Sequence, residues 1–268
     1  MKFPWRSRLT VSTIAAALFL AGCDTTSRDE TSKWTPEKIY AEAKEEAAAG
    51  NYDKAAKLYE RLEGRAAGTV LAQQAQIERA YLLWKTGEKA QALSTIERFL
   101  KLHPTSPAFD YALYLQGLIN FNDDLGFLGS LTGQDLAERD QQAARDAYQS
   151  FKQLVERFPQ SPYADDGRQR MNYIVNSLAA YEVHVARYYF RRGAYVAAVN
   201  RAKQTVLEFQ QSPSTEEALF LMAQGYDRLG LVQLRDDAER VLKQNYPNTA
   251  LDVASLGVNK KSRWWQLW

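Results

Sequence analysis

The chain is poor in the residues that build disulfides, metal sites and catalytic clusters. It has one cysteine and two histidines among 268 residues, so a disulfide has no second partner and a zinc site has few ligands. His103 and His184 each lack a second histidine at helical spacing. There is no GxSxG, no HExxH and no glycine-rich loop followed by Lys-Ser/Thr. These absences argue against an enzyme and predict no cofactor other than a covalent lipid.

An excess of charge of one sign is also missing. The chain has 34 basic and 32 acidic residues, for a formal net charge of +2. If residues 1–22 are removed, three basic residues leave with them, and 31 basic residues face 32 acidic ones. A nearly neutral chain predicts no nucleic-acid partner.

What the chain does have is a repeated spacing around glycine. In the stretch from Gly87 to Pro104, apolar residues lie 5, 9 and 12 positions after the glycine: Ala92, Ile96 and Phe99. The same frame fits three other glycines: Gly50, Gly193 and Gly230. A fifth copy ends at Pro159 and has Gln142 at the turn position. The period of 34 to 37 residues predicts an all-α tetratricopeptide solenoid of about five repeats, with a concave surface that binds polypeptides.

Residues 1–22 have the pattern of a secretory signal, in which a basic start is followed by a short apolar run. This stretch ends in Leu20-Ala21-Gly22-Cys23, which resembles the bacterial lipobox. We therefore expect Cys23 to be the lipidation site, with an ordinary signal and an incidental cysteine as the alternative. Residues 23–33 are polar and lack periodicity, so they are expected to form a flexible tether.

Hydroxyl residues next to proline predict where helices begin. Thr35 is expected to cap a helix that has Pro36 at its first position. Three Ser-Pro pairs are expected to do the same for later helices: Ser106-Pro107, Ser161-Pro162 and Ser212-Pro213. The acidic residues that follow each pair are expected to complement the helix dipole rather than to perform acid–base chemistry.

Two breaks in the period divide the array. Residues 34–161 are predicted to hold repeats one to three, with an insertion near residues 124–141. Phe127 and Leu128 make the insertion apolar, so it either contacts a partner or folds onto its own repeat. Residues 162–247 are predicted to hold repeats four and five.

The fourth repeat should begin with a helix from Pro162 to about Arg191, about 45 Å long at 1.5 Å per residue. Its apolar residues alternate by three and four positions and predict one packing seam: Met171, Ile174, Leu178, Tyr181, Val185 and Tyr188. This helix is expected to join the two halves of the array.

The last segment, residues 248–268, differs from the repeats. It ends in NKKSRWWQLW, where Trp264, Trp265 and Trp268 stand beside lysine and arginine. Indoles next to cations favour a lipid headgroup region or an aromatic-lined partner groove. Simple disorder is the alternative for this tail.

Three blocks of sequence resemble the BamD family, also called ComL: the lipobox, residues 72–121 and residues 158–171. The resemblance implies a lipoprotein of the bacterial β-barrel assembly machinery that helps outer membrane β-barrels to fold and insert. It also implies BamA, other lipoprotein subunits and unfolded outer membrane proteins as partners, and an outer membrane location facing the periplasm. Asp24 follows the cysteine, and in enteric bacteria an aspartate there tends to keep lipoproteins in the inner membrane.

The resemblance and the repeat frame together suggest partner-binding residues. For BamA these are in the C-terminal repeats: Arg201, Asp227 and Arg235. Arg201 is expected to reach solvent beside the inward-facing alanines of its helix, where a planar guanidinium can bind carboxylates. A groove for substrate or partner is expected to include Tyr81, Trp84, Phe127 and Leu128.

Two other kinds of protein remain as alternatives. A pilotin-like lipoprotein for secretin or pilus assembly would share the lipobox and the repeats but lack the blocks at 72–121 and 158–171. A cell-wall enzyme would show a catalytic cluster in a pocket.

Overall fold

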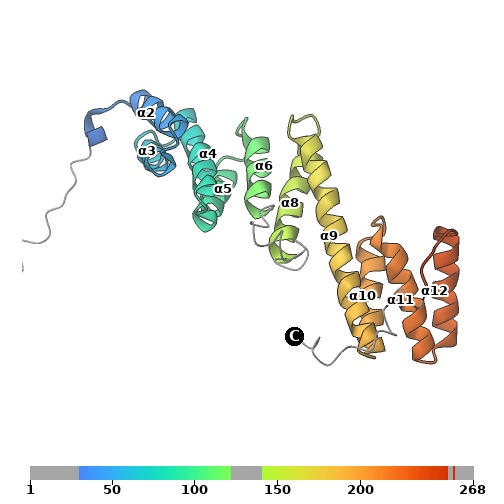
Figure 1. The fold of residues 1–268 in the computed structure, drawn as a ribbon. Coiled ribbons are helices and arrows are strands. Elements are labelled where there is room, and N and C mark those ends of the chain that lie inside the picture. The colour runs from blue at the N-terminus through green and yellow to red at the C-terminus, as the bar shows by residue number, and fades with distance from the viewer. Residues whose placement is uncertain (1–29, 122–140, 253–255, 257–268) are drawn as a thin grey trace, which may run out of the picture.

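The structure is a computed structural model, and it describes residues 30–121, 141–252 and 256. In these residues a short 3-10 helix, η1 (Glu30–Lys33), precedes ten α-helices, and there is no strand. The α-helices are α2 (Pro36–Ala48), α3 (Tyr52–Arg65), α4 (Val70–Lys85), α5 (Lys89–Leu102), α6 (Phe109–Asn120), α8 (Gln141–Arg157), α9 (Ala164–Arg191), α10 (Tyr195–Glu208), α11 (Ser214–Arg228) and α12 (Val232–Asn245). They form five antiparallel pairs laid side by side (Figure 1), which confirms the predicted tetratricopeptide solenoid.

Glycine makes the turn inside four of the five pairs. Gly50, Gly87, Gly193 and Gly230 have φ values of 82°, 84°, 77° and 72°, in the left-handed region that residues with a Cβ rarely adopt. At Gly50 the glycine N–H donates to the carbonyl of Ala47, and the next N–H, of Asn51, donates to the carbonyl of Glu46. These bonds satisfy the last carbonyls of α2, so the helix ends there and the chain reverses into α3.

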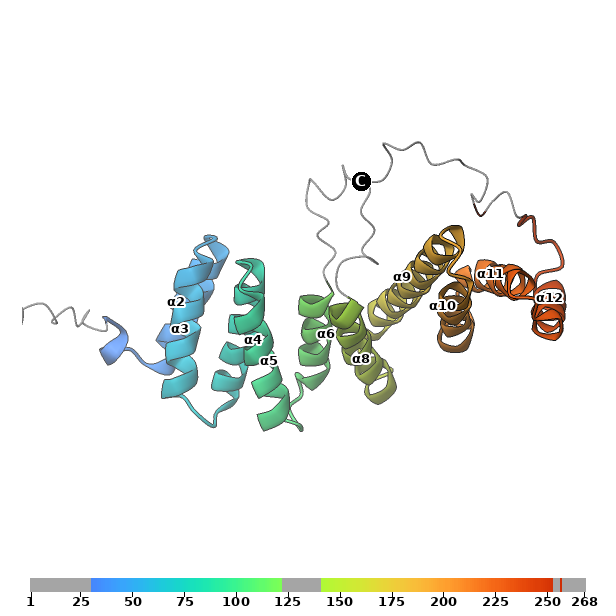
Figure 2. The same cartoon turned by 90° about the horizontal axis from the view of Figure 1, so that it is seen from below.

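The first helices of the repeats lie on the inner side of the array. Among the described residues, α2 contacts α4, α4 contacts α6 and α9 contacts α11, whereas the second helices have no comparable contact with one another. Figure 2 shows the pairs following one another from α2 to α12. Side chains on the first helices of successive repeats can therefore line one continuous surface.

Glycine is also placed where two helices approach most closely. A Cβ on Gly117 of α6 would lie 2.4 Å from Cε1 of Phe151, and a Cβ on Gly225 of α11 would lie 2.4 Å from Cγ2 of Val199. Phe151 is fully buried and Val199 nearly so, so neither can move away easily.

The helix starts agree only partly with the predictions. Thr35 accepts a hydrogen bond from the Lys38 N–H at 3.3 Å and precedes Pro36, as predicted. The Ser-Pro prediction was wrong, because Ser106, Ser161 and Ser212 lie two or three residues before the helices and accept the N–H two residues ahead. In each case the serine hydroxyl closes a turn ahead of the helix and does not cap the helix itself.

The long helix is present, but its predicted seam holds for only half of its length. α9 has 28 residues, and in its first half Ile174 and Leu178 are buried as predicted. In its second half Tyr181 and Val185 are only partly buried and Tyr188 is 45% exposed. The buried residues there are Ala179, Glu182, Val183, Ala186 and Phe190.

The reason is that α9 packs on different neighbours along its length. Its contacts are with α8 on one side and with α10 and α11 on the other. An undistorted helix drifts about 20° per heptad against a seven-residue repeat, so one straight seam cannot serve both sets of neighbours. The helix still joins the two halves of the array (Figure 1).

Several predicted segments lie outside the described residues. They are the signal and lipobox with Cys23, the insertion with Phe127 and Leu128, and the tail with Trp264, Trp265 and Trp268. Among the residues that were described, no helix has both the length and the apolar character needed to cross a membrane.

Candidate functional site

Tyrosines from the first helices of repeats one to three and from the start of α9 gather on the inner side of the array. We call this surface the tyrosine face, and it consists of Tyr40 of α2, Glu78 and Tyr81 of α4, Tyr111 and Tyr114 of α6, and Tyr163 at the start of α9. All six side chains are partly exposed. The repeat frame brings them together, because each comes from the first helix of its repeat or from the residue that precedes it.

Tyr111 lies at the centre of the tyrosine face. Its ring centroid is 5.2 Å from that of Tyr163, and Tyr163 stacks on Tyr114 at 4.9 Å with an interplanar angle of 19°. Burial and, to a smaller extent, the nearby carboxylate of Glu78 together raise the pKa of Tyr111 to about 12. The hydroxyl is therefore neutral at physiological pH and can both donate and accept hydrogen bonds.

The end of the tyrosine face beside α9 is fixed by a hydrogen-bonded network. The Tyr114 hydroxyl donates to Asp166 at 2.8 Å, and Nε of Arg170 donates to the same carboxylate oxygen at 2.6 Å. The guanidinium of Arg170 also lies 5.1 Å above the ring of Phe121. Asp166 thus holds a tyrosine and an arginine in place, which is a more specific role than the predicted complement to the helix dipole.

Glu78 is the one residue of the tyrosine face without a described partner. In the described part of the chain its carboxylate accepts no hydrogen bond and forms no ion pair. Burial raises the pKa of Glu78, and the charge of Lys44 opposes this rise without pairing with the carboxylate. The same carboxylate raises the pKa of Tyr40, Tyr59 and Tyr111, which places it within electrostatic reach of three hydroxyls.

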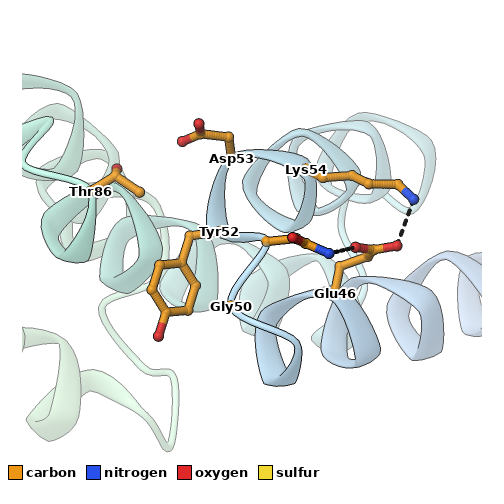
Figure 3. A pocket seen from close by; sticks show the side chains of 7 residues that line it. Glu46, Gly50, Tyr52, Asp53, Lys54 and Thr86 are labelled. Carbon is orange, nitrogen blue, oxygen red and sulfur yellow. Dashed lines mark hydrogen bonds and ion pairs between the residues drawn. The ribbon is translucent and has the colours of Figure 1, made fainter.

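A depression at the turn between α2 and α3 offers a useful contrast (Figure 3). It is lined by Glu46, Gly50, Asn51, Tyr52, Asp53, Lys54 and Thr86. Glu46 accepts hydrogen bonds from Lys54 at 2.5 Å and from Asn51 at 2.7 Å, and these bonds lower the pKa of Glu46. The Glu46 carboxylate therefore has its hydrogen-bond partners within the protein, and these bonds stabilise the turn. For this reason the depression is not our candidate site.

The structure describes two of the four residues predicted to form a groove, Tyr81 and Trp84. Tyr81 and Trp84 pack edge to face at 5.9 Å, and Lys85 lies over both rings. Tyr81 is close enough to Tyr111 to affect the pKa of Tyr111, so it belongs to the tyrosine face. Trp84 lies about one turn further along α4.

Arg201 reaches solvent in part, as expected, and its guanidinium is also paired within the protein. Its Nη1 donates to both carboxylate oxygens of Glu182, at 3.0 and 3.3 Å, and this pairing raises the pKa of Arg201. The Glu182 side chain is 3% exposed and the Arg201 side chain 42%. A glutamate at position 201 would place a second carboxylate beside the buried one of Glu182.

Arg235 lies close to Asp227, as predicted. Its Nη1 is 3.1 Å from Asp227 and its Nη2 is 2.8 Å from Asp236. These bonds raise the pKa of Arg235, which stands at the surface of α12. The structure thus joins Arg235 to Asp227 but places Arg201 in a separate ion pair.

Sequence reasoning missed Glu78, Tyr111, Tyr163 and Glu182. A signal for Glu182 was available, since it lies four residues from both Leu178 and Ala186 and so on the apolar stripe of its helix. No comparable signal marks Glu78, because its surroundings come from α2, α4 and α6. Only the stacking of repeats brings those helices together.

Taken together, the fold and the tyrosine face define a tetratricopeptide array with an aromatic surface on its inner side. Residues 32–242 match the family described as "YfiO: Outer membrane lipoprotein". The chain therefore belongs to this family of outer membrane lipoproteins, which confirms the resemblance found in the sequence.

Curated relatives in three bacteria agree with this assignment. The "Outer membrane protein assembly factor BamD" of Neisseria meningitidis serogroup A is 43% identical over 261 residues, 96% of this chain and 97% of the relative. The proteins of the same name from Xylella fastidiosa Temecula1 and Vibrio cholerae are 34% and 31% identical over 236 residues each. Each of these two matches covers 88% of this chain. The match covers 80% of the Xylella protein and 98% of the Vibrio protein.

Solved structures with some similarity include the MamA protein, with a TM-score of 0.33 and 14% identity over 81% of this chain and 97% of that one. Another is a tetratricopeptide repeat protein from Parabacteroides merdae, with a TM-score of 0.24 and 14% identity over 83% of this chain and 96% of that one.

Proposed function

We propose that this protein is a lipid-anchored, periplasm-facing scaffold of the β-barrel assembly machinery, and that it supports the folding and insertion of outer membrane β-barrel proteins. The relatives named as assembly factors support this role through identity over nearly the whole chain. The observation in the structure that carries the proposal is the tyrosine face, because it offers an extended aromatic surface along three repeats. We propose that unfolded outer membrane proteins bind there.

Aromatic surfaces suit such substrates. Tyrosine rings supply apolar contact area at low cost in conformational entropy, and their hydroxyls can bond to the backbone of an extended segment. The tyrosine face is held rigid by the Tyr114–Asp166–Arg170 network. A rigid surface loses little freedom when it binds an unfolded chain.

BamA is the proposed partner of the C-terminal repeats. Arg201 uses Nη1 on Glu182, while its other nitrogens have no partner within the described residues and the side chain is 42% exposed. Because the ion pair with Glu182 already restrains the Arg201 side chain, binding of its guanidinium to a carboxylate of BamA would cost less conformational entropy. Arg235 and Asp227 form a second charged point in the following repeat.

We propose that the remaining interactions depend on the two ends of the chain. Lipid on Cys23 would hold the protein on the outer membrane, and the Trp-rich tail would contact the membrane or another lipoprotein subunit. The role requires no catalysis and no cofactor.

The direct test is recovery of partners from envelopes solubilised in a mild neutral detergent, with the full chain tagged after the lipidated cysteine. BamA should be the main co-purifying protein. Recovery of a secretin or pilus subunit without BamA would favour the pilotin-like alternative and contradict the proposal. A matched sample from cells depleted of BamA shows whether other subunits bind this chain directly.

A further inference from the structure

We propose that Glu78 is a cation-recognition point within the tyrosine face, where it binds a lysine or arginine side chain of an extended polypeptide. This inference rests on the proposed binding of unfolded polypeptide by the tyrosine face, and it adds a preference for segments with a basic side chain. Three observations carry it: the carboxylate is unpaired, Lys44 acts on it through charge without forming an ion pair, and tyrosines lie around it.

The first observation comes from comparing Glu78 with four partly or fully buried carboxylates that each have an arginine partner. Glu63 lies 2.7 Å from Arg98, Asp166 2.6 Å from Arg170, Glu182 3.0 Å from Arg201, and Glu217 2.5 Å from Arg187. Glu78 has no such partner among the residues that the structure describes. A partly buried ion without a partner loses hydration and gains nothing in return, so a ligand that supplies a cation recovers this loss.

The second observation is the position of Lys44. This lysine affects Glu78 through its charge, but no hydrogen bond or ion pair joins the two in the described structure. Its Nζ lies 5.9 Å from the ring centroid of Tyr40, on the same helix. Lys44 therefore acts on the carboxylate from a distance and does not occupy it as an ion-pair partner.

The third observation is the set of groups around the carboxylate. The hydroxyls of Tyr40 and Tyr111 lie within its electrostatic reach, and Tyr81 lies beside Tyr111. Tyrosine rings attract cations on their faces, so a carboxylate among tyrosines forms a site for an ammonium or guanidinium. An acidic segment would be repelled, and an apolar segment would cover the charge without pairing it.

A polypeptide side chain fits this site better than a free metal ion does. A metal ion needs several protein ligands, and in the described ranges no group of three or more His, Cys, Asp or Glu residues could hold one. The tyrosine face instead continues on both sides of Glu78, toward Tyr40 on α2 and Tyr111 on α6. An extended segment that crosses α4 can place one basic side chain on Glu78 and neighbouring side chains on the rings.

The experiment uses the full acylated chain in neutral detergent micelles and fluorescent peptides of 12 residues that alternate phenylalanine with serine. One peptide carries a central arginine and the other carries citrulline, the neutral isostere of arginine. Fluorescence anisotropy should show that the arginine peptide binds about 10-fold more tightly, as expected for a charge-assisted contact among aromatic rings. Glu78→Gln should remove this preference and leave the affinity for the citrulline peptide unchanged.

Two further variants sharpen the test. Glu97→Gln changes an exposed glutamate on α5, the second helix of that repeat, and should retain the full preference. Glu78→Lys should reverse the preference, so that a peptide with central glutamate binds more tightly than the arginine peptide. Circular dichroism of each variant checks that the helices are intact.

The failures of the two proposals differ. If both peptides bind wild type equally, or if Glu78→Gln keeps the preference for arginine, the cation site is wrong while polypeptide binding stands. If neither peptide binds the folded protein, binding of unfolded polypeptide by the tyrosine face is wrong and the cation site is rejected with it.

Discussion

Glu182 and Arg201 form an ion pair whose two ends differ in exposure. The Glu182 carboxylate lies on the buried stripe of α9 and is 3% exposed, whereas Arg201 of α10 is 42% exposed. A buried carboxylate needs a cation, so Arg201 contributes to the stability of the fold. Its exposed nitrogens at the same time make it a candidate for contact with a partner. Any substitution of Arg201 therefore changes both properties.

We predict that Arg201→Glu lowers the free energy of unfolding by about 3 kcal/mol, because it leaves Glu182 unpaired and adds a second negative charge beside it. Arg201→Lys keeps the charge and should cost only about 1 kcal/mol. Urea denaturation followed by circular dichroism measures both. Arg191→Glu, at an exposed site near the end of α9, is the matched control and should change stability by less than about 0.5 kcal/mol. Equal stability of Arg201→Glu and this control would contradict the role of the ion pair.

Binding to BamA has to be tested with variants that keep the fold. Arg201→Lys preserves the charge on Glu182 but loses the planar fork, so we expect about 10-fold weaker binding to BamA. Arg235 belongs to exposed pairs, so Arg235→Glu should leave the midpoint of urea denaturation close to that of wild type while it weakens binding. Surface plasmon resonance with immobilised BamA provides the affinities. If both variants bind as wild type within about 0.5 kcal/mol, the contact does not involve these arginines.

The sequence predicted the repeat architecture because spacing alone determines it. The frame around Gly50 and Gly87 marks turns with left-handed glycines, and the residues at fixed distances after each glycine form the buried face. Predictions based on neighbouring residues in the sequence were less successful where a side chain also bonds to a second element. Ser161 forms a turn and donates to Asp110 of another helix at 2.7 Å, which its own neighbours in the sequence do not reveal.

The candidate site was harder to predict than the fold. Tyr81 was identified because it is a large aromatic residue on a first helix, but Glu78 lies three residues earlier and looks like an ordinary charge on a helix surface. Its unpaired state depends on the distances to Lys44 and to the tyrosines of two other helices. Such distances follow from the packing of neighbouring repeats, and the spacing of one repeat does not contain them.

The close approach of helices at two glycines leads to a stability prediction. Gly117→Ala and Gly225→Ala would each place a Cβ 2.4 Å from a buried side chain. We expect each to lower the free energy of unfolding by about 2 kcal/mol, because the neighbouring helices must move apart. Gly64→Ala is the control, since nothing lies within 4 Å of its new Cβ in α3. This control should gain about 0.5 kcal/mol from helix propensity, and a similar gain at Gly117 would show that the helices are not in close contact there.

Membrane attachment is predicted to depend on Cys23. Cys23→Ser should either release the protein into the soluble periplasmic fraction or leave it unprocessed, because the chain would carry no lipid. Flotation of membranes in a density gradient measures the attachment. A variant that is processed normally and still floats with membranes would disprove lipid anchoring. In the same gradient, wild type should follow the outer membrane despite Asp24, and an inner membrane position would contradict the proposed role in outer membrane assembly.

The unpaired carboxylate of Glu78 predicts an unusual dependence of stability on pH. Burial raises the pKa of Glu78 above its ordinary value of 4.5, so the folded protein holds this proton to higher pH than the unfolded chain does. Below pH 4.5 Glu78 is mostly protonated in both the folded and the unfolded protein, so its ionisation hardly lowers the free energy of unfolding. As pH rises from there through the raised pKa, the penalty grows to its full value and then stays constant.

Glu78→Gln removes this charge and should therefore be more stable than wild type at pH 7.5, by up to about 1 kcal/mol. The gain should disappear at pH 4, because the wild-type side chain is then neutral as well. Lys44→Gln should act in the opposite direction at pH 7.5, since the charge of Lys44 lowers the pKa of Glu78. Thermal unfolding at the two pH values measures these differences, with Glu97→Gln as the control that is equal to wild type at both. If the stability gain of Glu78→Gln is the same at pH 4 and pH 7.5, ionisation of a partly buried Glu78 is not its cause.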